Sequence, residues 1–216
     1  MAPNESQIRA RGIADTASAA DPATIQAIGR GAMAAHNSDG PSGYFDAVKH
    51  VIGETKWPSP KLHTTANDCY TGERIVVSAA SGIEVNHACA ASSSLPGSMG
   101  PTWLGNRLCM DGGICQTSTH SDVVTGVKKA LIISLTDGSA DASKIGLRTS
   151  SLPNTLQQEV TDLKAQGTEV ILKVVGLMPG ATHIDSIMDP KWIGPCLKNG
   201  HERGLADAGD MKAFWS

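Results

Sequence analysis

The sequence predicts an α/β protein, and the evidence lies in its second half. Residues 130–135 (Ala-Leu-Ile-Ile-Ser-Leu) are apolar rather than alternating, which is typical of a parallel strand buried on both faces. An amphipathic helix is expected next, with apolar residues at helical spacing from Leu152 to Leu163 and Gly167 as its C-terminal cap. Residues 169–175 then form a second apolar strand. Strand, helix and strand with short connections make a βαβ unit.

The N-terminal part is expected to be helical. Residues 8–35 are rich in alanine and predict one or two helices, broken near Asp21 and Pro22. Aspartate is a good N-cap and proline suits the first helical position, so a second helix should begin there. We expect residues 1–45 to form a helical segment that packs with an α/β region, residues 46–216, as one compact domain.

A β-hairpin is expected in the middle of the chain. Residues 62–67 and 74–78 have the composition of strands, and a turn containing Gly72 separates them. Asp68 is expected to shape that turn by accepting a hydrogen bond from the backbone. The remaining expected elements are a small-residue helix at 86–94, a short strand at 107–110 and a helix within 189–208.

Composition excludes several classes of function. The chain has 216 residues, 40% of them hydrophobic and 18% charged, as in a globular protein. Its net charge of −3 and the absence of a basic run argue against nucleic acid as a partner. Residues 1–20 have no continuous apolar core, so neither a signal peptide nor an anchor is expected there. A cytoplasmic location, with at most peripheral membrane contact, is the resulting expectation.

No metal or cofactor site is expected from the sequence. The five cysteines include no C-x-x-C pair, and an odd number suits reduced thiols. The histidines do not form a metal-binding spacing such as H-x-x-x-H.

The strongest candidate for chemistry is Asp111, at the end of a strand and directly before Gly112 and Gly113. Glycine tolerates a sharp bend with positive φ and leaves the carboxylate approachable.

Two motifs in this region carry a resemblance to a known family. Residues 91–97 read Ala-Ser-Ser-Ser-Leu-Pro-Gly, so that a small-residue helix ends at Pro96 and Gly97 about a dozen residues before the Asp-Gly-Gly turn. This combination resembles the A-S-x-x-x-P-G segment and the aspartate motif of patatin-like phospholipases. The similarity extends over roughly residues 50–208, about three quarters of the chain.

The resemblance implies a three-layer α/β/α fold and a Ser–Asp dyad that hydrolyses acyl esters of lipids. In such a dyad the aspartate orients the serine or accepts its proton, the part that histidine has in a triad. The nucleophile normally lies in G-x-S-x-G on a strand-to-helix turn, which this chain does not contain. The resemblance therefore implies a sheet that lacks its first strands. Ser98, after the Pro-Gly turn, is the substitute nucleophile to test first, and His120 is expected at the mouth of the pocket.

Two functions follow from these residues. The first is a serine-type lipolytic acyl hydrolase, a carboxylic ester hydrolase acting on lipids or short-chain acyl esters. The second is a non-catalytic remnant of a patatin-like domain that acts as a binding or interaction module. A sheet without its first strands would expose edges and apolar surface, which favours homo-oligomers unless the N-terminal helices cover the gap.

Overall fold

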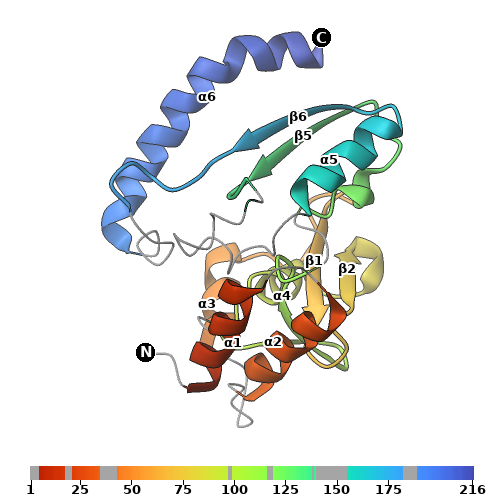
Figure 1. Ribbon diagram of the computed structural model, residues 1–216, viewed down its shortest axis with the longest axis vertical. Helices are drawn as coiled ribbons and strands as arrows, with labels where there is room; N and C mark the ends of the chain where they lie inside the picture. The colour runs from red at the N-terminus through yellow and green to blue at the C-terminus, as the bar shows by residue number, and fades with distance from the viewer. Residues whose placement is uncertain are drawn as a thin grey trace.

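A computed structural model shows a mixed α/β structure, in which the described residues form two separate sheets (Figure 1). The coarse prediction of helices and strands packed together is therefore confirmed. One sheet has four strands and lies against the helices of the N-terminal part, while the other is a pair of strands flanked by the last two helices. The structure describes residues 5–17, 21–34, 43–96, 99–115, 119–137, 139, 155–181 and 189–216.

The four-stranded sheet is antiparallel throughout. Its strands are β1 (His63–Asp68), β2 (Arg74–Ser78), β3 (Thr102–Leu104) and β4 (Arg107–Asp111), in the order β2-β1-β4-β3. The predicted hairpin is confirmed, since β1 pairs with β2 from His63↔Ser78 to Asn67↔Arg74. The role expected of Asp68 is also confirmed, because its carboxylate accepts hydrogen bonds from the N–H groups of Tyr70 (2.8 Å) and Thr71 (3.1 Å).

Helices cover both faces of this sheet. On one face lie α1 (Glu5–Thr16) and α2 (Pro22–Ala34), and Ile25 and Ile28 of α2 share a buried cluster with Met110 of β4. On the other face lies α4 (Val85–Ser92), which follows η1 (Ala79–Ser81) and buries Ala88 against Ala66 of β1. The described strands of this sheet are all antiparallel, so the patatin-like three-layer α/β/α fold that the resemblance implies stays a prediction.

The start of α2 is the one expected from the sequence. Asp21 precedes Pro22, and its side chain accepts hydrogen bonds from the N–H of Thr24 (3.0 Å) and from its hydroxyl (2.7 Å). The carboxylate thus satisfies an N–H that has no partner inside the helix. The next helix, α3 (Gly43–Ile52), crosses the boundary expected at residue 45 and packs beside α4.

The predicted βαβ unit is present in the second half of the chain. Strands β5 (Lys129–Ser134) and β6 (Glu169–Val174) are parallel, and α5 (Leu156–Ala165) packs on one face of the pair. Gly167 follows α5 with a φ of +86°, as expected of a glycine at a helix end. The first residue of the predicted apolar stripe, Leu152, lies outside the described residues.

The chain ends in a long helix. After η6 (Pro190–Trp192), α6 (Ile193–Trp215) runs along the face of the β5–β6 pair opposite to α5 (Figure 1). Polar contacts hold α6 to the strands: Arg203 donates to the carbonyl oxygens of Val174 (2.9 Å) and Val175 (2.8 Å). The helix expected within residues 189–208 is confirmed, and it continues to Trp215.

Candidate functional site

The two motifs singled out in the sequence lie side by side. The N–H of Asp111 donates to the carbonyl oxygen of Ser94 (3.0 Å), and the N–H of Gly112 donates to that of Ser92 (3.3 Å). Ser92 is the last residue of α4 and Ser94 follows the helix, so neither carbonyl oxygen accepts a hydrogen bond from a helical N–H. The end of α4 is therefore fixed to the Asp-Gly-Gly turn at the end of β4.

A buried asparagine holds the backbone of this turn. The side-chain amide of Asn67, which is fully buried in β1, donates to the carbonyl oxygens of Asp111 (2.8 Å) and Gly112 (3.3 Å). The carboxylate of Asp111 accepts a hydrogen bond from the N–H of Gly113 (2.7 Å). These three bonds restrict the turn, so the Asp111 side chain leaves β4 in a defined direction.

Gly112 is needed here for a reason that the sequence did not reveal. We expected a glycine with positive φ, but the backbone of Gly112 is not in that region. Instead β1 approaches so closely that a Cβ at this position would lie 2.4 Å from the carbonyl oxygen of Thr65. Close approach of two backbones is the second common reason for a glycine in a turn.

The carboxyl group of Asp111 lies in surroundings of low polarity. Burial raises the pKa of Asp111 to about 6, against the lowering effect of the Gly113 N–H. Burial raises the pKa of Tyr44, a residue of α3, and a hydrogen bond with Ser93 opposes this effect. The nearby charge of Asp111 raises the pKa of Tyr44 further. A carboxyl with a pKa near neutrality suits general base catalysis.

The serines that end α4 have structural partners. The hydroxyl of Ser93 donates to the carbonyl oxygen of Cys89 (2.7 Å), and that of Ser94 donates to Ala90 (2.8 Å). Such bonds to the preceding helical turn are common for serine. Among the described residues, no serine hydroxyl donates a hydrogen bond to the carboxylate of Asp111.

The serine expected as nucleophile lies next to this region in the chain. Ser98 and Gly97 are outside the described residues. Pro96, before them, is buried, and the N–H of Met99, after them, donates to the carbonyl oxygen of Leu95 (2.8 Å). The backbone on both sides of this pair is therefore fixed close to the end of α4, which itself contacts the Asp-Gly-Gly turn.

His120 also contacts the Asp-Gly-Gly turn, and the sequence did not predict this contact. Its backbone is left-handed (φ 53°), and its ring forms a hydrogen bond with the backbone carbonyl of Gly112. Burial lowers the pKa of His120, and the neighbouring charge of Arg74 lowers it further; the Arg74 guanidinium lies 3.4 Å from Nδ1. Arg74 also forms a two-bond ion pair with Asp122, at 2.6 and 2.5 Å.

The segment that carries His120 is tied to the βαβ unit. Glu159, on α5, is buried and accepts hydrogen bonds from the N–H groups of Thr119 (3.1 Å) and Ser121 (3.2 Å). Ser121 begins the short helix η2 (Ser121–Val124), which contacts α5. A buried carboxylate is stable here because backbone donors replace the water that it has lost.

The described part of the chain has few features of other kinds of site. No group of three or more His, Cys, Asp or Glu side chains in it could hold a metal ion. Its helices include none that is both long and apolar enough to cross a membrane. The cysteines in it are free thiols, and three of them are buried: Cys69, Cys109 and Cys115.

Comparisons with known proteins do not identify a family. No family model, no curated protein and no solved structure matches the chain.

Proposed function

We propose that the protein is a serine-type acyl hydrolase with a patatin-like active site, in which Asp111 is the general base and Ser98 the nucleophile. The observation that carries the proposal is the pair of backbone hydrogen bonds between the end of α4 and residues Asp111 and Gly112. They bring a carboxyl with a pKa of about 6 to the end of α4, where Ser94 precedes Ser98 by four residues in the sequence. Both parts of a Ser–Asp dyad would then meet at one end of the sheet.

The chemistry proposed is ester hydrolysis in two steps. Ionised Asp111 accepts the proton of the Ser98 hydroxyl while the serine oxygen attacks the ester carbonyl, and the alcohol leaves with a proton as the acyl-enzyme forms. Water then releases the acid and regenerates the serine. The substrate class is a lipid or short-chain acyl ester, no cofactor takes part, and the proposed location is cytoplasmic with at most peripheral membrane contact.

A binding module without catalysis is the second candidate. It is favoured by the hydrogen bond from Gly113 to the Asp111 carboxylate, which alone would explain an aspartate at this position as part of a turn. Under this alternative the raised pKa of Asp111 has no catalytic use, and the hydroxyl of Ser98 is an ordinary alcohol.

Labelling with a fluorophosphonate ester separates the two functions. The expected result is one adduct at Ser98, located by mass spectrometry and absent from Ser98→Ala. Ser93→Ala is the matched control and should label like the wild type, since its hydroxyl is bonded to Cys89. If no serine labels and p-nitrophenyl esters are not hydrolysed, the hydrolase is excluded. An adduct at another serine would keep the hydrolase and exclude Ser98 as nucleophile.

Activity and stability should change in opposite directions between about pH 4 and pH 6. The folded pKa of Asp111 is about 6 and its ordinary value is 3.8, so the folded state binds the proton more tightly than the unfolded state. The free energy of unfolding should therefore decrease as the pH rises through this range. In contrast, kcat/KM for a p-nitrophenyl ester should increase, because only the ionised carboxylate accepts a proton.

The measurement compares urea unfolding and ester hydrolysis at several pH values in wild type and Asp111→Asn. Subtracting the unfolding curve of the variant isolates the contribution of Asp111 from that of other carboxyl groups. If the unfolding free energy of the wild type minus that of Asp111→Asn increased with pH over this range, the folded state would favour the ionised carboxylate. That result would contradict the raised pKa of Asp111.

A further inference from the structure

A pocket of about 400 Å³ lies between the β5–β6 pair and α6, within the size range of small-molecule sites. The wall formed by the strands is apolar and includes Leu131, Ile133 and Val175. The opposite wall is one face of α6. This pocket is built from elements other than those that carry Asp111, so its function can be argued and tested independently.

The apolar wall is not covered by the described protein. Ala130 and Ile132 are buried under α5, whereas Leu131 is 36% exposed and Ile133, on the same face, is 65% exposed. The sequence predicts a strand buried on both faces, and for this face the prediction is wrong. An apolar surface left open in this way usually marks a site of interaction.

Two glycines on α6 keep the pocket open. Gly200 and Gly204 line it together with Cys196, Asp207 and Met211, at the spacing of three and four residues that defines one helix face. A Cβ at either glycine would meet nothing within 4 Å, so close packing does not require glycine here. Glycine inside a helix costs about 1 kcal/mol relative to alanine, so this open face of α6 has a cost in helix stability.

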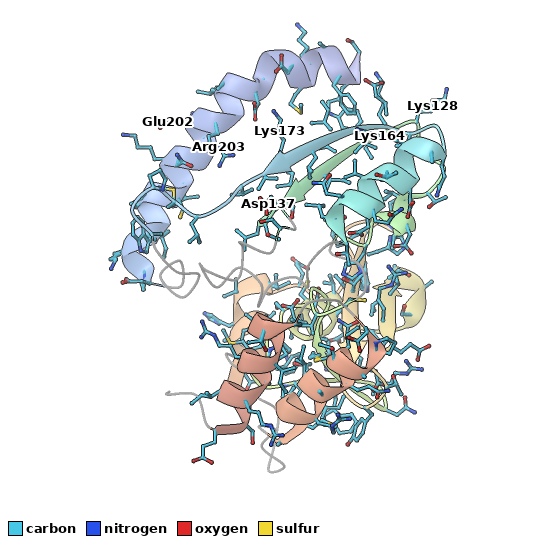
Figure 2. All side chains as sticks on the ribbon, in the orientation of Figure 1. Lys128, Asp137, Lys164, Lys173, Glu202 and Arg203 are labelled. Atoms are coloured by element: carbon cyan, nitrogen blue, oxygen red, sulfur yellow. The ribbon has the colours of Figure 1, made fainter. Side chains whose placement is uncertain are left out.

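Among the described residues that line the pocket, the side chains carry one more positive charge than negative charge. Lys173, on β6, is paired with Asp207, on α6, at 2.8 Å, and Figure 2 shows Lys173 and Arg203 on facing elements. Arg203 reaches from α6 to the carbonyl oxygens at the end of β6, which are neutral acceptors. Among the described residues no carboxylate lies within ion-pair distance of Arg203. Its guanidinium has five N–H donors, so donors remain for an anionic ligand.

We propose that this pocket binds a fatty acid, with the alkyl chain between the apolar strand face and the glycine face of α6 and the carboxylate on Arg203. An alkyl chain matches the wall formed by Leu131, Ile133 and Val175 and needs no hydrogen bond there. A carboxylate head group would supply the counter-charge that the described side chains do not supply to Arg203. The inference does not depend on hydrolysis at Asp111.

Filling the pocket tests where the alkyl chain lies. The full chain is titrated with dodecanoate, below its micelle concentration, by isothermal titration calorimetry. Gly204→Leu should weaken binding by at least about tenfold, because the leucine side chain occupies the pocket. Gly209→Leu is the matched control: it lies on the same helix, a Cβ there also meets nothing within 4 Å, and it does not line the pocket. Neither variant should lower the Tm, since both remove a helical glycine.

Removing the cation tests where the head group lies. Arg203→Met should weaken dodecanoate by about tenfold and leave dodecanol, which has the same chain without the charge, nearly unchanged. Lys198→Met removes an exposed cation of α6 outside the pocket and should change neither. Equal weakening of both ligands by Arg203→Met would overturn the assignment of the carboxylate.

Three further results would overturn the proposal. The first is a wild-type protein that does not bind dodecanoate, and the second is a Gly204→Leu variant that binds it as well as the wild type does. The third is a wild-type protein that forms a dimer in analytical ultracentrifugation and does not bind dodecanoate, while Gly204→Leu is monomeric. In that case a second copy of the chain covers the apolar face.

Discussion

Asp111→Asn should reduce kcat/KM for a p-nitrophenyl ester by about 10²- to 10⁴-fold, the range that general base catalysis contributes. The amide cannot accept the proton of a serine at neutral pH, although its oxygen can still accept the hydrogen bond from Gly113. Stability should not decrease, because at neutral pH the substitution removes a charge from surroundings that raise the pKa of its carboxyl. Initial rates and thermal unfolding of the same preparation measure both effects.

The control for this prediction is Asp210→Asn. Asp210 lies on the exposed side of α6, away from the Asp-Gly-Gly turn, and its loss should change neither the rate nor the Tm. An aspartate that only maintains the turn would behave differently. Its replacement would lower the Tm, and the remaining activity would follow the fraction of folded protein.

Gly29→Ala should destabilise the protein by about 2–3 kcal/mol, the largest change in stability that we expect from adding a single methyl group. Gly29 lies in α2 where the helix crosses the end of β1, and a Cβ there would be 2.1 Å from the carbonyl oxygen of Cys69. The nearest atoms are all backbone, so no side chain can move away to make room. The helix and the hairpin must separate, which also disturbs the packing of Ile25 and Ile28.

Urea unfolding followed by circular dichroism measures this loss. Gly12→Ala is the matched control, since Gly12 is also in an N-terminal helix but has nothing within 4 Å of its Cβ position. That variant should gain about 0.5–1 kcal/mol from helix propensity. If both variants were stabilised, the close packing of α2 on the hairpin would be incorrect.

Local patterns predicted the elements whose cause is local. The turn at Asp68, the cap at Asp21 and the glycine after α5 each depend on residues within a few positions, and all three are present. Strand β3 was not predicted, because it has only three residues and exists by pairing with β4. The sequence likewise could not indicate that α1 and α2 cover the antiparallel sheet, since that packing joins residues far apart in the chain.

In the candidate site too, residues in local motifs were predicted and residues brought together by the fold were missed. Asp111 and the end of α4 were singled out from motifs, and backbone hydrogen bonds join them. Asn67 and Arg74 were missed, although Asn67 contacts the turn and Arg74 contacts His120. Asn67 reads as the last residue of a strand, and only the pairing of β1 with β4 brings its amide to the Asp111 carbonyl. Arg74 comes close to His120 only because residues 46 positions apart meet in the fold.

The buried carboxylate of Glu159 has a consequence for cooperativity. It belongs to α5, yet it holds the two amides on either side of His120, whose ring contacts Gly112. Opening of α5 would therefore release His120, and opening of the turn would release a restraint on α5. The βαβ unit and the antiparallel sheet are coupled at this point, so the local unfolding of one costs free energy in the other. The position of Asp111 thus depends partly on α5, a helix that packs on the β5–β6 pair.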